Sequence, residues 1–113
     1  WDIDANNSVE PLEDGLLFIR YLFEFTGDPL VDAAVDMNGE RTLPSEIEAF
    51  LETHSAAIDI DGDGETRALA DGLMVIRYFF GFRDDSLIEG AVSATATRIT
   101  SDKIEACIEA NMP

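Results

Sequence analysis

The sequence of 113 residues contains very little of two residue types, cysteine and lysine, that mark common classes of small protein. Cys107 is the only cysteine, so the chain can form neither an internal disulfide framework nor a cysteine-based zinc cluster. Lys103 is the only lysine, and Lys and Arg together number 7 against 24 Asp and Glu. Nucleic acid is therefore not an expected partner, because its phosphates require a basic face.

Long apolar runs are also missing. No stretch approaches the roughly 18 apolar residues of a membrane-spanning helix, so we expect no membrane insertion. The formal net charge is −17, yet 46% of the residues are hydrophobic, which is too many for an acidic disordered segment. We therefore expect a single folded domain, residues 1–113, whose carboxylates lie on its surface or around bound cations.

The sequence repeats itself after 57 residues. Residues 1–57 and 58–113 align without a gap, and about twenty positions are identical. Each copy has an acidic loop, an apolar helix, a turn region and a shorter amphipathic helix, in that order. The pattern predicts an all-α fold in which two tandem loop-helix-turn-helix repeats pack as one pseudo-two-fold domain.

Capping and breaking residues predict the helix boundaries. We expect long apolar helices near 12–25 and 69–82, and shorter helices over 45–54 and 101–111. Gly27, Asp28 and Pro29 form a breaker cluster that should end the first helix. By symmetry with the helix that precedes loop two, we expect the C-terminal helix to fold back beside loop one.

The two long helices are apolar nearly all round. Their apolar positions are Leu16, Leu17, Phe18, Ile19, Tyr21, Leu22, Phe23 and Phe25, and in the second copy Leu73, Met74, Val75, Ile76, Tyr78, Phe79, Phe80 and Phe82. A small domain needs such residues inside, so we expect them to form the core. The alternative is an exposed apolar surface that contacts a partner, which exposure of Phe18, Phe25 or Phe82 would favour.

The strongest motif is the acidic loop of the second copy. Asp59, Asp61 and Asp63 alternate with other residues and precede Gly64, which is the D-x-D-x-D-G signature of an EF-hand loop. Alternate carboxylates converge on a cation there, and glycine at the sixth place permits the sharp turn. We expect the three aspartates and the Glu65 carbonyl to bind one Ca²⁺.

The end of this loop departs from the usual pattern. Arg67 holds the ninth place and cannot ligate, so we expect water there. The twelfth place, normally an acid, is Ala70, and the first acid after it is Asp71. Asp14 is displaced in the same way in the first copy. The two repeats therefore share a variant loop, and we expect Asp14 and Asp71 to close the two ligand shells.

Loop one offers a similar set of oxygen ligands. The expected ligands are Asp2, Asp4, Asn6, the Ser8 carbonyl and Asp14, with Glu10 binding directly or through water as an open alternative. Asn7 replaces the turn glycine, which is tolerable because asparagine visits the left-handed region readily. We expect two Ca²⁺ ions, with loop one occupied but weaker. Mg²⁺ is less expected, because it prefers a tight octahedron that retains waters.

Two alternative interpretations concern the acidic segments. The loops could be solvated turns without metal, but two aligned copies and the mutual repulsion of their carboxylates favour a cation. The segment 36–40, with Glu48 beyond it, also alternates oxygen-bearing residues. The second copy has no acid in the matching segment, so we expect an ordinary polar turn there.

The loop-helix units resemble those of dockerins, a family of bacterial secreted proteins. The similar stretches are Asp2 to Asp14 followed by Ile19-Arg20-Tyr21-Leu22, and Asp59 to Asp71 followed by Ile76-Arg77-Tyr78-Phe79. The resemblance implies calcium binding, an extracellular or cell-surface location, and docking to a cohesin-like partner or a neighbouring domain.

The chain differs from standard dockerins in three respects. Its closing acid is displaced by one place, its repeats stand farther apart, and each repeat has an additional helix. Pro11-Leu12 and Ala68-Leu69 also stand where dockerins carry the polar groups that recognise cohesin. The resemblance therefore covers calcium binding more fully than it covers cohesin recognition.

These observations predict a structural or adhesive module that two Ca²⁺ ions stabilise, with docking to a cohesin-like partner as the alternative. Catalysis is not expected, because the acids cluster at ligand spacing and no nucleophile elbow or phosphate loop is present. His54, the only histidine, lies near a helix end and predicts a surface or capping role. Cys107 aligns with Phe50 and predicts a buried apolar role.

Overall fold

The computed structural model describes residues 1–54 and 57–111, and the regular structure of these residues is entirely helical. The α-helices are α1 (Leu16–Leu22), α2 (Asp28–Val31), α3 (Pro44–Thr53), α4 (Leu73–Phe79), α5 (Asp85–Ile88) and α6 (Ser101–Asn111). Two π-helical turns, η1 (Pro11–Gly15) and η3 (Ala68–Gly72), lead directly into α1 and α4. The predicted all-α class is confirmed. The short helices α2 and α5 lie in segments that were expected to be turns.

The long apolar helices end three residues earlier than predicted. In the first, the Phe25 N–H donates to the Arg20 carbonyl (3.0 Å) and the Glu24 N–H to the Tyr21 carbonyl (2.9 Å). This is the Schellman motif, in which the residue after the helix takes a left-handed conformation, here Glu24 with φ 65°. Gly27 and its neighbours therefore do not end this helix but begin α2, which starts at Asp28.

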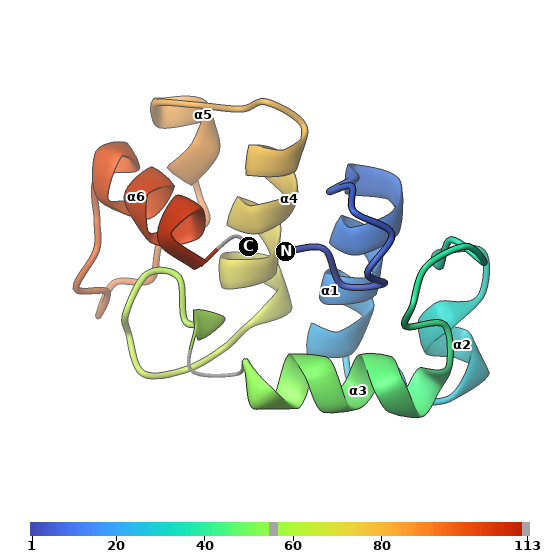
Figure 1. Cartoon of the computed structure of the whole chain (residues 1–113). Coiled ribbons are helices and arrows are strands. Elements are labelled where there is room, and N and C mark those ends of the chain that lie inside the picture. Colours follow the sequence, from blue (N-terminus) through green and yellow to red (C-terminus); the bar gives the residue numbers. More distant parts are fainter. Residues whose placement is uncertain (55–56, 112–113) are drawn as a thin grey trace.

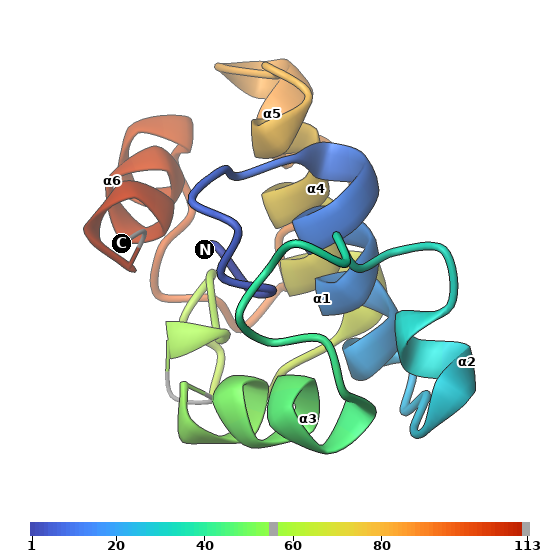
Figure 2. The same cartoon turned by 45° about the vertical axis from the view of Figure 1, so that its right-hand side comes forward.

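Helices α1 and α4 form the centre of the molecule. Figures 1 and 2 show them side by side and running in opposite directions, with α3 across the C-terminal end of α1. Helix α6 packs against α5, and Glu109 accepts a hydrogen bond from the Tyr78 hydroxyl (2.9 Å). Helix α6 therefore packs against its own repeat, and its expected position beside loop one stays a prediction.

The contacts between the two repeats are reciprocal. A Cβ on Gly15 would lie 3.2 Å from Phe79, and a Cβ on Gly72 would lie 3.0 Å from Leu22. Gly15 and Gly72 are equivalent positions in the repeats, and so are Leu22 and Phe79. Glycine lets the turn of each repeat approach the central helix of the other closely. Reciprocal contacts of this kind are what a two-fold rotation between equivalent units produces.

The backbone of the two repeats also takes the same unusual conformations. Residues with positive φ fall in equivalent pairs, namely Ala5 and Gly62, Asn7 and Gly64, Glu24 and Gly81, Gly27 and Asp84, and Ala33 and Gly90. Left-handed conformations are costly for residues other than glycine, so they mark positions that the surrounding structure imposes. Loop one therefore makes the same turns as loop two, although Ala5 and Asn7 replace the two glycines.

The core lies between the central helices and the shorter elements around them. It contains Trp1, Ile3, Leu17, Phe18, Leu30, Ala34, Ile47, Leu51, Ile58, Ile60, Met74, Val75, Leu87, Ala91, Ile104 and Ile108. Cys107 packs partly buried against it, and His54 is the C-cap of α3. Phe23, Phe25, Phe80 and Phe82, which follow the central helices, are between 44% and 55% exposed. The prediction that all the apolar positions form the core is therefore only partly right.

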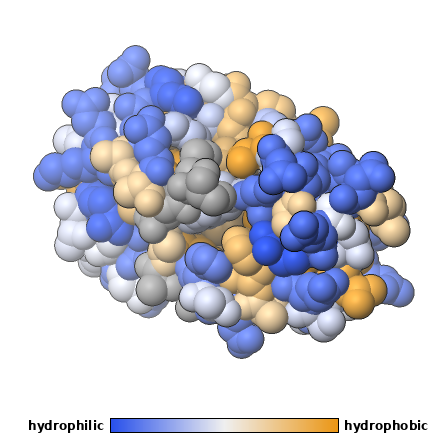
Figure 3. Space-filling model, in the orientation of Figure 1, coloured by the Kyte–Doolittle hydropathy of each residue, from blue (hydrophilic) through white to orange (hydrophobic). Residues whose placement is uncertain are grey.

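The face of the molecule drawn in Figure 3 is mainly hydrophilic. Figure 3 shows apolar side chains near the middle of one face, with hydrophilic side chains to either side. Within the described residues, no helix is long and apolar enough to cross a membrane.

Candidate metal sites

The fold brings three carboxylates together in each repeat. Ligand oxygens of Asp2, Asp4 and Asp14 lie within 4.8 Å of one another, and those of Asp59, Asp61 and Asp71 do the same. Asp4, Asp14, Asp61 and Asp71 are at most 1% exposed, whereas Asp2 and Asp59 are partly exposed. Each cluster therefore combines two buried carboxylates with one that faces solvent.

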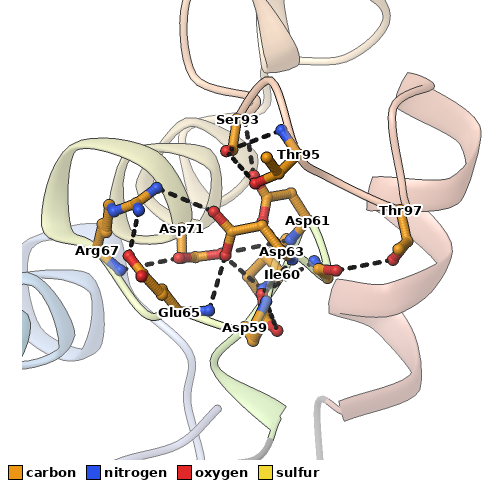
Figure 4. Close-up of polar contacts among 12 residues, drawn as sticks. Asp59, Ile60, Asp61, Asp63, Glu65, Arg67, Asp71, Ser93, Thr95 and Thr97 are labelled. Atoms are coloured by element: carbon orange, nitrogen blue, oxygen red, sulfur yellow. Dashed lines mark hydrogen bonds and ion pairs between the residues drawn. The ribbon is translucent and has the colours of Figure 1, made fainter.

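The first aspartate of each loop holds the turn of the backbone. In loop two the Asp59 carboxylate accepts hydrogen bonds from Gly62 (2.9 Å), Asp63 (3.1 Å) and Gly64 (2.9 Å) through their backbone N–H groups. Figure 4 shows the resulting loop, with Asp59, Asp61 and Asp71 directed toward a common centre. In loop one, Asp2 accepts from the N–H groups of the equivalent Asn6 (3.0 Å) and Asn7 (2.9 Å).

The displaced closing acids reach the clusters because a π-helical turn accommodates the additional residue. The Gly72 N–H donates to the Arg67 carbonyl five residues earlier (3.1 Å), where an α-helix would make the bond to the fourth. Asp71 then accepts hydrogen bonds from the N–H groups of Ile60 (2.7 Å) and Arg67 (2.9 Å). This carboxylate therefore joins the beginning of the loop to its end.

Asp14 has the same environment in the first repeat. It accepts from the N–H groups of Ile3 (2.6 Å) and Glu10 (2.9 Å), and the Gly15 N–H donates to the Glu10 carbonyl (3.2 Å). π-helical turns are rare and are often found at functional sites. Their occurrence at the same place in both repeats indicates that positioning the closing acid matters to this fold.

A pair of arginines that sequence reasoning missed clamps the loops from outside. Arg98 donates to the carbonyls of Ile60 and Asp59 (both 2.6 Å), and Arg41 donates to those of Ile3 and Asp2 (both 2.7 Å). These arginines occupy equivalent positions and are among the identical residues of the repeats. Their identity in the two repeats could have marked these arginines as important to the fold, but it did not indicate which groups they would contact.

Replacing a clamp arginine is expected to destabilise its repeat. Arg98→Met leaves the Ile60 and Asp59 carbonyls without their charged donor, which should lower the free energy of unfolding by about 2–3 kcal/mol. Chemical denaturation followed by circular dichroism measures this change. The control is Arg83→Met, an exposed arginine that pairs with Glu105 (3.6 Å) and donates to the Tyr78 and Phe82 carbonyls at the surface. A loss below about 1 kcal/mol is expected there, because these contacts remain accessible to water. Equal losses in the two variants would contradict the role of the clamp.

The central buried acid of each loop is also held by a segment far away in sequence. The N–H of Ser93 donates to Asp61 (2.8 Å), and the N–H of the equivalent Asp36 donates to Asp4 (2.8 Å). The Asp36 carboxylate accepts from the Asn38 N–H (2.8 Å), as expected for a polar turn. The segment 36–40 therefore supports loop one as a turn.

The remaining predicted ligands lie in the loops but outside the two carboxylate clusters. Asp63 forms an ion pair with Arg67 (2.9 Å), and Glu65 contacts the same guanidinium. The Asn6 side-chain amide donates to Glu13 (3.2 Å). The Ser8 and Glu10 side chains hydrogen-bond to each other (3.1 Å). For Ser8 and Glu65 the predicted ligand atom was the backbone carbonyl, so these side-chain contacts leave those oxygens available.

Burial makes several of these carboxylates hard to ionise. Removal from water raises the pKa of Asp4, Asp14 and Asp71 above the ordinary value, although backbone N–H groups partly oppose the shift. The pKa of Glu13 is raised to about 7, chiefly by hydrogen bonding with the neighbouring Glu10 carboxyl. A bound cation would stabilise the ionised form of these carboxylates and reduce the repulsion between them.

These shifts predict an unusual pH dependence for protein kept in chelator. A carboxyl group whose pKa is higher in the folded state than in the unfolded state stabilises the fold while it is protonated. This stabilisation is complete below the pKa of the unfolded state, about 4, and is lost as the pH rises through the pKa of the folded state. Asp63, whose pKa is lowered chiefly by the Glu65 N–H, stays ionised above pH 5. Glu13, whose pKa of about 7 lies between the two values, should therefore make the melting temperature in chelator higher at pH 5 than at pH 8.

Calcium should reverse this dependence, because only ionised carboxylates bind it. Thermal melts at both pH values, with chelator and with calcium, measure the two effects. A lower melting temperature at pH 5 than at pH 8 in chelator would contradict the raised pKa of Glu13.

The fold and the two clusters define a small helical protein with two acidic, oxygen-lined sites of a kind suited to a divalent cation. Comparison with models of known protein families, with curated proteins and with solved structures finds no match. The resemblance to dockerins therefore rests on the residues of the loop-helix units alone.

Proposed function

We propose that the chain is a calcium-binding module in which two EF-hand-like loops, related by a pseudo-two-fold axis, each hold one Ca²⁺. The observation that carries the proposal is the convergence of three carboxylates within 4.8 Å in each repeat. Two of the three are buried in both cases, so their charge is not dissipated by solvent. A divalent cation neutralises this charge and supplies the partner that buried carboxylates need.

The chemistry of the donors favours calcium over other metals. Within the described residues, both clusters consist of carboxylates, and hard oxygen ligands suit Ca²⁺ and Mg²⁺ better than zinc or copper. Loop carbonyls, Asn6 and Asp63 are within the same loops and would raise the number of ligands toward the six to eight that Ca²⁺ takes. Mg²⁺ is less suited, because it demands a strict octahedron at shorter distances.

The proposed role of calcium is structural. Each closing acid already joins the two ends of its loop and begins a central helix, so an ion bound there would hold together the loop and helix of that repeat. No internal disulfide is available to a chain with one cysteine. We propose that the module belongs to a secreted or cell-surface protein, as the resemblance to dockerins implies, where extracellular calcium keeps both loops occupied.

The only tryptophan provides a test for loop one. Trp1 packs against Phe18 with ring centroids 4.9 Å apart and precedes Asp2 directly in the chain. Terbium, which replaces calcium in oxygen-rich sites, should luminesce when Trp1 is excited, and calcium should displace it. Asp2→Ala should abolish the signal, whereas Asp59→Ala in the other loop should leave it. Terbium luminescence that persists unchanged in Asp2→Ala would reject a site in loop one.

A second candidate role is docking to a partner, and the exposed aromatic residues favour it. Phe23, Phe25, Phe80 and Phe82 follow the central helices and remain about half exposed, which is unusual for phenylalanine in a small soluble domain. The partner we propose is a cohesin-like domain or a neighbouring domain of the same protein. Pull-down with purified cohesin-like domains tests this role. If the role is right, Phe25→Ser and Phe82→Ser should each be captured less than the unaltered chain.

A further inference from the structure

The two loops differ in charge at their ninth place. Loop one has Glu10 there and loop two has Arg67. The Arg67 guanidinium lies 2.9 Å from an Asp63 carboxylate oxygen and also contacts Glu65. Figure 4 shows the arginine reaching back over the loop to these two acids. Loop two therefore already has a cationic group bonded to one of its predicted calcium ligands.

The two members of this ion pair differ in their exposure to solvent. The Asp63 side chain is 3% exposed, whereas that of Arg67 is 50% exposed. The other Asp63 oxygen accepts the Glu65 N–H at 2.8 Å, so both oxygens of this carboxylate are in use. The guanidinium enters from solvent and can return to it without leaving a cavity in the core. Asp63, in contrast, is fixed within the loop.

We propose that Arg67 is an internal competitor that lowers the affinity of loop two for calcium. The inference depends on the proposed calcium-binding function. To use the Asp63 oxygen held by Arg67, Ca²⁺ must displace the guanidinium, and afterwards the positive charge of Arg67 remains near the ion. Both effects weaken binding at loop two and have no counterpart at loop one, where Glu10 adds negative charge. Arg67 also partly neutralises loop two before calcium arrives.

Calorimetric titration of the whole chain with calcium tests this competition. Arg67→Gln should tighten the binding event of loop two by about tenfold, the size expected for removing one unit charge roughly 6 Å from a divalent ion in water. The event of loop two is identified as the one that Asp59→Ala removes. The reciprocal variant Glu10→Arg should weaken calcium binding at loop one. That binding is followed separately by the displacement of terbium, whose luminescence is excited through Trp1.

The control is Arg83→Gln, which removes one positive charge from the same repeat but pairs with Glu105 in α6 and not with the loop. It should leave both binding events within about twofold of the unaltered chain. Unchanged or weaker binding of loop two in Arg67→Gln would overturn the inference, provided the unaltered chain binds calcium. Absence of binding in the unaltered chain and in Arg67→Gln would overturn the proposed function itself, and with it this inference.

Discussion

Calcium added to chelator-treated protein is expected to raise the free energy of unfolding by about 4 kcal/mol per loop when free calcium is about a thousand times the dissociation constant. The reason is that the ion binds only the folded state, where the three carboxylates of each cluster are brought within 4.8 Å. In a domain of this size each kcal/mol raises the melting temperature by roughly 3–4 °C. Two occupied loops should therefore raise it by about 20 °C or more.

Thermal melts with chelator, with calcium and with an equal concentration of magnesium measure this effect. Magnesium is the control for general screening of the net charge of −17, because any divalent cation reduces that repulsion. The expected increase with magnesium is much smaller. Equal increases with the two ions would show that calcium acts by screening alone and not at specific sites.

The second large effect is expected for Asp71→Asn. This substitution removes the buried charge that calcium requires but keeps an oxygen that can accept one of the loop N–H groups. In calcium, the variant should lose the stabilisation of loop two, about 4 kcal/mol. In chelator, its stability should fall by only about 1–2 kcal/mol, because loss of one hydrogen bond is partly offset by removal of a carboxylate whose burial raises its pKa.

Denaturation of Asp71→Asn with calcium and with chelator separates these two contributions. Asp14→Asn should behave in the same way through loop one, which provides an internal replicate. Asp102→Asn, in the exposed first turn of α6, should change stability by less than about 0.5 kcal/mol under both conditions. A loss for Asp71→Asn that is equal in calcium and in chelator would mean that the carboxylate serves the fold alone.

The positions of the acidic clusters could be predicted from the sequence because they depend on local spacing and on the repeat. Alternating aspartates in a turn-forming loop place their side chains toward one centre, and the second copy indicated that the pattern was not accidental. The closing acids Asp14 and Asp71 were predicted in spite of their displacement. The π-helical turn that brings them to the clusters was not predicted, since apolar periodicity does not distinguish it from the first turn of an α-helix.

The helix ends and the core were predicted less well, for a physical reason. Glu24 takes the left-handed conformation that closes the Schellman motif, and nothing in a glutamate indicates this choice. Only its equivalent Gly81 carried the expected signal. Ending at Leu22 and Phe79, the central helices leave the aromatic residues beyond them outside the core.

The sequence motifs did not predict contacts between distant segments of the chain. Arg41 and Arg98 clamp loops that begin 39 residues earlier in the chain, and spacing alone could not pair them. The expectation that loop one is the weaker site depended on Asn7 replacing a glycine. Asn7 takes φ 69° and makes the same turn as Gly64, so this feature does not distort the loop. Arg67 instead marks loop two as the one with a competing charge.

Isothermal titration of chelator-treated protein with calcium tests most directly whether the two carboxylate clusters are calcium sites. We predict two binding events per chain, of which Asp2→Ala removes one and Asp59→Ala the other. A titration without heat of binding, or with the same two events in both variants, would contradict the account.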